Sequence, residues 1–379
     1  MIGFVHRLSF AIIAWLPVFL PNTSAIAQPL ASARPDSVES ESAKRKALQF
    51  LLKMQSKDGA WRSRDYGNMK QGAAITSLVL YALSHLPDED VPGFRSAIDR
   101  AAEFLKRGIL RNRCVCNPDG SLDYSVYSTA MVLTAHKRIG IGLSGDDEQT
   151  LVDYLLSCQC DTQRGFKPAN PNFGGWDILG PGATGGKTAG ANVSVTFYVI
   201  EALEASKNPQ VKPAIGKAKA WCQRILLSNE KGGFYFTSEP NSTLNKAGLS
   251  EQQIPRPYGT ATCDGLGIML LTGFSLQSAE VSTTIGWIKS HPSFSKVPGF
   301  ETDDETGWKD GLRFYYLASL ARSLNQIPGK HSKSKTSIRR TLEKLQKPDG
   351  SWQSLFTHMR EDDKMIATPI ALLALLLLK

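Results

Sequence analysis

Apolar residues along the chain fall into six pairs of helical segments. The first segment of each pair carries charged side chains on one face, and the expected ranges are 42–55, 97–108, 148–158, 214–227, 280–290 and 335–346. The second is almost wholly apolar, over 73–86, 127–139, 193–205, 261–274, 312–324 and 366–378. A helix with one charged face covers a surface, whereas a helix that is apolar all round is buried. The pattern predicts an all-α fold, an (α/α)6 toroid with inner and outer helix rings over residues 42–379. Periodicity alone leaves an open solenoid as the alternative.

A short motif links the two segments of a pair. Gln55 is followed by Asp58-Gly59-Ala60-Trp61, and Gln346 by Asp349-Gly350-Ser351-Trp352. Glycine can end a helix with a positive φ, the Gln amide can bond free terminal carbonyls, and Trp can pack against the neighbouring pair. Weaker copies are expected at 117–120, 164–166 and 231–234.

The first 27 residues have the pattern of a secretory signal. Arg7 precedes an apolar run that is short for a membrane span, and Ala25-Ile26-Ala27 fits a signal peptidase site before Gln28. An uncleaved anchor is the alternative, and it would be the chain's one membrane contact. Residues 28–41 are expected to form a flexible tether. The protein is therefore expected to be exported, to the periplasm or the extracellular space.

Composition narrows the partners. The chain has 42% hydrophobic and 21% charged residues, which excludes a disordered or collagen-like protein. Its net charge is +9, but the basic residues are scattered, so no nucleic-acid partner is expected. A hydrophobic small molecule, a polymer or a protein partner is expected instead.

The Gln…Asp-Gly-x-Trp motif resembles the repeat of the terpenoid cyclase and protein prenyltransferase superfamily, which includes squalene–hopene cyclase. The stretches 257–262, 311–317 and 362–363 are more similar still to its exported bacterial relatives with a single ring, the prenyltransferase/squalene oxidase repeat proteins. The resemblance covers residues 42–379. It implies a central cavity lined by the ends of the inner helices and the loops between them.

The resemblance also directs attention to acids. Class II terpene cyclases protonate their substrate with an Asp-x-Asp-Asp motif, which is absent here. Three candidate acids remain: Asp264, in an otherwise apolar helix, Asp304, in Glu301-Thr302-Asp303-Asp304, and Asp310. Asp264 can instead be a helix cap or a structural acceptor, and Asp304 part of a solvated loop.

Other candidates concern ligands and sulfur. Trp176, Tyr258, Trp308, Tyr315 and Asp363 are expected to line the cavity, with core packing as the alternative for the aromatic residues. The glycine-rich stretch 174–190 is expected to be a loop over the ring mouth and a lid.

The prenyltransferase zinc motif Asp-x-Cys is absent, so no metal and no cofactor are expected. Two pairs of cysteines occur about one repeat apart: Cys114, Cys116, Cys158 and Cys160. Disulfides between the two loops, a four-thiolate zinc site and reduced packing all remain open.

Two functions follow, with a weaker third. The favoured hypothesis is a toroid that binds a hydrophobic or polymeric ligand, or a partner, without the usual catalytic motifs. The alternative is a divergent class II terpenoid cyclase, an isomerase that uses a cavity Asp as its acid. Carbohydrate chemistry is the third, because α/α toroids also carry it. An enclosed aromatic pocket with a buried carboxyl favours the cyclase, and a shallow wet groove favours binding or carbohydrate work.

Overall fold

The computed structural model describes residues 35–180, 190–227, 232–239, 242–301 and 306–378. The expected helix pairs are present. The outer helices are α1 (Pro35–Met54), α3 (Arg95–Asn112), α5 (Gly145–Ser157), α7 (Val211–Leu227), α9 (Ala279–Ser290) and α12 (Ser332–Leu345). The inner helices are α2 (Ala73–Leu83), α4 (Ser125–Ile139), α6 (Val193–Leu203), α8 (Gly259–Leu271), α11 (Arg313–Gln326) and α13 (Lys364–Leu377). The remaining short helices are α10 (Trp308–Gly311), η1 (Gly67–Met69), η2 (Val91–Phe94) and η3 (Thr162–Arg164). The described residues contain isolated β-bridges but no β-strand.

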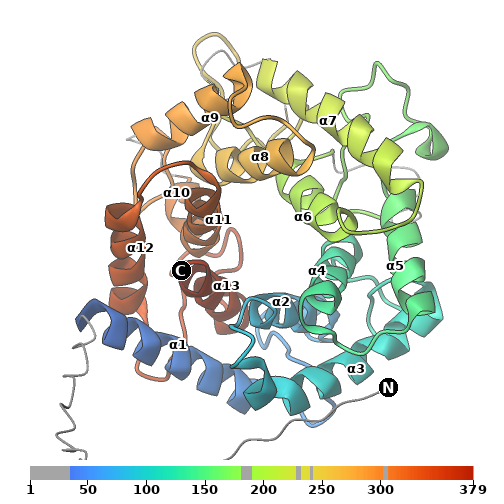
Figure 1. Cartoon of the computed structure of the whole chain (residues 1–379), viewed down its shortest axis with the longest axis vertical. Helices are drawn as coiled ribbons and strands as arrows, with labels where there is room; N and C mark the ends of the chain where they lie inside the picture. The colour runs from blue at the N-terminus through green and yellow to red at the C-terminus, as the bar shows by residue number, and fades with distance from the viewer. Residues whose placement is uncertain (1–34, 181–189, 228–231, 240–241, 302–305, 379) are drawn as a thin grey trace, which may run out of the picture.

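The two rings are closed, as Figure 1 shows. Each inner helix packs on its two inner neighbours, and α13 completes the inner ring by packing on α2. The outer helix α1 contacts both α12 and α13. At this junction the amide of Gln346 donates a 2.8 Å hydrogen bond to the carbonyl of Ala43. The (α/α)6 toroid is therefore confirmed, and the open solenoid is excluded.

Three glutamine side chains join neighbouring repeats. Each amide donates one hydrogen bond to the carbonyl of its own turn glycine and a second to a carbonyl of the following outer helix. The bonds are Gln55 to Gly59 (2.9 Å) and Ala97 (2.8 Å), Gln159 to Gly174 (2.8 Å) and Ala214 (2.8 Å), and Gln346 to Gly350 (3.0 Å) and Ala43 (2.8 Å). The glutamine thus bonds terminal carbonyls, as expected, and also sets the spacing between hairpins.

The turn glycines allow close contact with the next outer helix. Gly59, Gly174 and Gly350 have φ angles of 93°, 101° and 87°. An added Cβ would lie 2.1, 2.3 and 2.4 Å from a backbone carbonyl oxygen of that helix. A side chain is therefore excluded on two grounds, left-handed backbone and lack of space.

Three buried tryptophans join the outer and inner rings. Their indole N–H groups donate to carbonyls near the end of the preceding outer helix, and their backbone N–H groups donate to a threonine of the following inner helix. The bonds are Trp61 to Leu51 (2.7 Å) and Thr76 (2.9 Å), Trp176 to Leu155 (2.7 Å) and Thr196 (3.0 Å), and Trp352 to Leu342 (2.8 Å) and Thr368 (3.1 Å). Two more pairs, Val115 to Thr129 and Phe234 to Thr262, repeat the backbone bond at 3.0 Å. A buried Trp with its N–H bonded fixes both rings in register.

Two expectations need correction. The third copy of the motif is formed by Gln159, Gly174 and Trp176 and not by residues 164–166, because an insertion separates the glutamine from its glycine. Helix α1 begins at Pro35, so residues 35–41 are helical and not part of a tether. Proline suits the first helical position, where its missing N–H has no intrahelical partner. The predicted signal and residues 28–34 lie outside the described residues. In the described part of the chain, no helix is both long and apolar enough to cross a membrane.

Candidate functional site

A central cavity lies at the end of the inner ring where the inner helices begin. Its volume is about 470 Å³, and most of its lining is apolar or aromatic. Residues at or near the start of all six inner helices contribute: Ala74, Tyr124, Asn192, Tyr258, Leu312 and Ile366. The segments that join outer to inner helices add Met69, Ile178, Phe236, Leu244, His358 and Met359. The six inner helices therefore begin around one shared cavity.

Asp264 lies deeper in this cavity, on the second turn of α8. It is six residues beyond Tyr258, the N-cap of that helix, which is a rise of about 9 Å. Its side chain is 1% exposed and forms part of the cavity wall. Asp264 is therefore not a helix cap, one of the two structural roles that the sequence left open.

Three side chains of α11 donate hydrogen bonds to the Asp264 carboxylate. The Tyr315 hydroxyl is 2.7 Å from Oδ2, and the Ser319 hydroxyl is 3.0 Å from Oδ1. The Arg322 guanidinium is 3.3 Å from Oδ1. Residues spaced by four and three share one helix face, so this face of α11 is matched to a single acid. The Tyr315 hydroxyl also makes a short hydrogen bond with Ser194 of α6.

Burial and hydrogen bonding act on Asp264 in opposite directions. Burial raises the pKa of the Asp264 carboxyl, and Arg322 and the hydroxyls of Tyr315 and Ser319 offset part of that rise. Burial also raises the pKa of Tyr315 well above its ordinary value, so this phenol stays a donor. The arrangement can hold a carboxylate, and it can also exchange a proton with a bound molecule.

Arg322 extends this network across three inner helices. Its guanidinium lies 3.9 Å from the ring centroid of Phe197 and 5.6 Å from that of Tyr198, both on α6. The residue is 8% exposed. Sequence reasoning missed Arg322, although an arginine in the middle of an inner helix is a signal that it is paired, because an unpaired buried cation is costly.

Lys246 lines the end of the cavity where the inner helices begin. It belongs to the segment between α7 and α8, and its Nζ lies 3.3 Å from the ring centroid of Phe236 and 5.3 Å from that of Trp308. Its described hydrogen bond is to the carbonyl of Leu244, at 3.4 Å. Burial lowers the pKa of Lys246 to about 7. No carboxylate of the described residues forms an ion pair with Lys246, which sequence reasoning also missed.

Two further basic side chains line the same end of the cavity. The Arg360 guanidinium lies 4.8 Å from the ring centroid of Tyr66 and 5.6 Å from that of Tyr124. The His358 ring is centred 4.7 Å from that of Trp308. This end is therefore basic and aromatic, whereas the deeper wall carries an acid.

Three of the expected ligand-binding residues, Tyr258, Trp308 and Tyr315, line the cavity. Trp176 does not, because it is the fully buried tryptophan of the third repeat. Asp363 is also outside the lining: it caps α13 through a 2.7 Å hydrogen bond from the Met365 N–H and accepts a short one from the Ser63 hydroxyl. These two assignments were wrong because both side chains are committed to the fold.

Of the three candidate acids, only Asp264 is among the described residues that line the cavity. The Asp310 side chain pairs with Arg313 at 2.8 Å and Lys296 at 3.9 Å, and it is not part of the cavity lining. Asp304 lies outside the described residues. Asp264 is thus the one carboxylate among the described residues that line the cavity.

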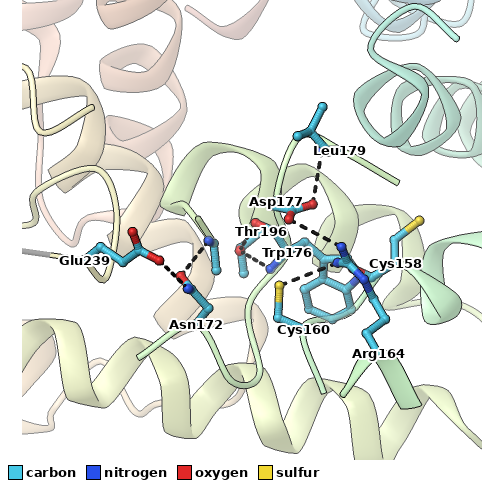
Figure 2. A network of polar contacts seen from close by, with 10 residues as sticks. Cys158, Cys160, Arg164, Asn172, Trp176, Asp177, Leu179, Thr196 and Glu239 are labelled. Carbon is cyan, nitrogen blue, oxygen red and sulfur yellow. Dashed lines mark hydrogen bonds and ion pairs between the residues drawn. The ribbon is translucent and has the colours of Figure 1, made fainter. Parts of the chain in front are cut away.

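The insertion in the third repeat is held by a polar network (Figure 2). Arg164 donates to the carbonyl of Cys158 at 2.7 Å, to the sulfur of Cys160 at 3.6 Å and to the carboxylate of Asp177 at 3.5 Å. The amide of Asn172 donates to Glu239 at 2.6 Å. The start of the expected lid, residues 174–180, is therefore tied to the wall, and Ile178 lines the cavity. Residues 181–189 lie outside the described part.

The cysteines are buried free thiols in this structure. The predicted disulfides are therefore not formed in it. The Cys116 thiol donates to the carbonyl of Gly108 at 3.3 Å, within its own hairpin. Burial raises the pKa of Cys158 and of Cys160 to about 12, which keeps both thiols protonated. Among the described residues, no group of three or more His, Cys, Asp or Glu side chains is arranged to hold a metal ion, and this removes the four-thiolate zinc site.

Known structures share this fold. No protein-family model matches the chain, and no curated protein matches its sequence. The type II terpene cyclase MstE from Scytonema, in complex with geranylgeranyl dihydroxybenzoate, is 14% identical with a TM-score of 0.60, over 91% of this chain and 99% of that one. Its complex with merosterolic acid A has a TM-score of 0.58 at 13% identity, over 90% and 98% of the two chains. An alpha-1,6-mannanase of Salegentibacter, in complex with alpha-1,6-mannotriose, is 13% identical with a TM-score of 0.55, over 90% and 100%.

The similarity covers almost the full length of the compared structures. At 13–14% sequence identity, however, it shows a shared fold and nothing more specific. The similar structures include a cyclase and a glycoside hydrolase, so the fold does not indicate which reaction, if any, this chain catalyses. What they show is that this chain has the α/α toroid fold of the type II terpene cyclase and mannanase structures.

Proposed function

We propose that this protein is an exported toroid that binds an elongated hydrophobic molecule in its central cavity. The observation that carries the proposal is the cavity itself, a space of about 470 Å³ with an apolar and aromatic lining at the start of six inner helices. Ligand sites are commonly concave and apolar with a few polar groups that fix orientation. Here Asp264, Lys246 and Arg360 are such groups.

The lining favours a hydrophobic molecule over a sugar polymer. Glycoside hydrolysis ordinarily uses two carboxyl groups on either side of the scissile bond. Asp264 is the one carboxylate among the described lining residues, and tyrosine, phenylalanine and aliphatic side chains surround it. The carbohydrate hypothesis therefore lacks a second acid in the part of the cavity that is described.

A second candidate is a proton-initiated isomerase of the type II terpene cyclase kind, with Asp264 as the acid. A buried carboxyl of raised pKa in an aromatic-lined cavity favours it. Three donors of α11 oppose it, because Tyr315, Ser319 and Arg322 all stabilise the ionised carboxylate. These donors offset part of the rise in pKa that burial causes, so they act against the protonated carboxyl that such an acid needs, and for this reason we place binding first.

Native mass spectrometry of the purified protein tests the binding proposal. We expect a bound hydrophobic molecule that extraction with organic solvent removes and that chelation and reduction leave in place. Ala74→Phe narrows the cavity at the start of α2 and should reduce the bound fraction. Ala220→Phe on the exposed face of α7 is the matched control and should not. Equal occupancy in the two variants would place the molecule elsewhere and contradict the proposal.

Turnover separates the two candidates. Under the binding proposal, squalene incubated with the protein is recovered unchanged, as gas chromatography with mass spectrometry can show. Under the cyclase candidate, cyclic products form and disappear in Asp264→Asn. Asp177→Asn is the matched control, since Asp177 is also buried and paired with an arginine but lies outside the cavity.

Export rests on the sequence of residues 1–27. If it is correct, the protein recovered from the cell envelope or medium begins at Gln28, which N-terminal sequencing determines. Recovery of the chain with Met1 intact from the cytosol would contradict it.

A further inference from the structure

Charge is distributed unevenly along the cavity. Lys246, His358 and Arg360 line the end where the inner helices begin, and Asp264 lies about 9 Å further along α8 than its N-cap Tyr258. The rest of the wall is largely apolar, with side chains such as Leu78, Met131, Val195 and Leu373. A molecule that fills this space therefore meets cations at one end and hydrocarbon along most of its length.

The acid at the far end already has its partners. Asp264 accepts from Tyr315, Ser319 and Arg322, so its charge is balanced within the wall. Lys246 differs, because its described contacts are two aromatic rings and one backbone carbonyl. Lys246 is partly buried in the lining, and a carboxylate on a bound ligand would supply the anion that its described contacts lack.

We infer that the cavity takes an amphipathic ligand with a carboxylate head group, which binds Lys246, and a hydrocarbon chain, which extends toward the Asp264 end. The inference rests on the proposed function and specifies its ligand class. Arg360 lies over Tyr66 and Tyr124 at the same end of the cavity and adds positive potential there.

The protonation of Lys246 supports this assignment. Burial lowers the pKa of Lys246 to about 7, and a bound carboxylate would raise it again, so binding near neutral pH takes up a proton. His358 and Arg360, from the segment before α13, also line this end. Lys309 and Asp310 follow Trp308 on α10, and neither is part of the cavity lining. On α8, Tyr258 and Asp264 face the cavity. Affinity for a carboxylate should therefore fall as pH rises above 7.

Isothermal titration calorimetry with dodecanoic acid and with dodecanol tests the inference, because the two molecules share a chain and differ in the head group. The delipidated full protein should bind the acid about tenfold more tightly than the alcohol, as expected for one charge-assisted contact. Lys246→Met should lose this preference and keep its affinity for the alcohol. Lys219→Met is the matched control: Lys219 also lies over a phenylalanine ring, at 4.7 Å, and bonds a carbonyl, but it is on the outer helix α7.

The outcomes are distinct. Equal binding of acid and alcohol by the unaltered protein, or a preference that survives in Lys246→Met, overturns the carboxylate assignment and leaves the hydrophobic cavity standing. Failure of both molecules to bind overturns the proposed function and this inference with it. A preference lost equally in Lys219→Met would show a general charge effect and also overturn the role of Lys246.

Discussion

Replacing Asp264 by asparagine tests whether the buried network is first of all structural. The Arg322 guanidinium is 3.3 Å from Asp264, and the two side chains are 10% and 1% exposed. Removing one partner of a buried pair costs about 3–5 kcal/mol, because the other charge is left without compensation. We expect about 3 kcal/mol, the lower end, since Arg322 keeps its contact with the Phe197 ring at 3.9 Å. In the double variant Asp264→Asn/Arg322→Met the stranded cation is gone, and the loss should shrink to about 1–2 kcal/mol.

Urea unfolding followed by tryptophan fluorescence measures these free energies of unfolding. Glu103→Gln is the control: it breaks an exposed pair with Lys106 at 2.8 Å and should cost at most about 0.5 kcal/mol. A loss below about 1 kcal/mol for Asp264→Asn, or a double variant that loses the sum of the two single losses, would refute the pairing argument. If Asp264→Asn is stable and abolishes turnover, the carboxyl serves chemistry and the cyclase candidate takes precedence.

Three further predictions follow from single contacts. Gly350→Ala should lower the free energy of unfolding by about 2 kcal/mol or more, because φ is 87° and the added Cβ would lie 2.4 Å from the carbonyl oxygen of Lys46, where the ring closes. The control is Gly286→Ala, in open space on α9, which should be neutral or stabilising in the same urea assay. Between pH 7 and about 10 the unaltered protein should gain stability relative to Lys246→Met, because Lys246 in the unfolded chain still binds a proton that it has released in the folded protein. A difference in the free energy of unfolding between the two proteins that stays constant over this range would contradict the lowered pKa. Titration with Ellman's reagent in denaturant without reductant should count six thiols, slow to react in the folded protein, whereas a count of two or four would show disulfides.

The fold was predictable because its repeat is local. Each repeat contains a charged helix, a glutamine, a glycine turn and an apolar helix within a few tens of residues. The sequence of each copy therefore specifies its own helical hairpin. The third copy escaped because the insertion between Gln159 and Gly174 changes the spacing and leaves the contacts intact. The backbone-to-threonine bonds, such as Trp61 to Thr76, also escaped notice, since a threonine in an apolar helix gives no sign of what it accepts.

The site was less predictable because it depends on which way individual side chains point. Asp264 stood out as an acid in an apolar helix, and the structure places it in the cavity wall. Trp176 and Asp363 are equally prominent in the sequence, but they serve a buried hydrogen bond and a helix cap. Lys246 could not be found, because the path of the long segment between α7 and α8 decides whether a lysine meets solvent or Phe236.

The ring explains why one end of the molecule carries the candidate site. All inner helices begin at the cavity, so their partial positive ends converge there and favour negative charge. The segments that join outer to inner helices cross the same end, and they can change without disturbing the glutamine and tryptophan contacts that hold the rings. The same toroid can therefore house a terpene cyclase or a mannanase, and the lining decides between them. In this chain the lining combines an acid paired with an arginine (Asp264 with Arg322), an apolar wall and a lysine without a described acidic partner (Lys246). That combination fits the binding of an acidic lipid better than the cleavage of a sugar.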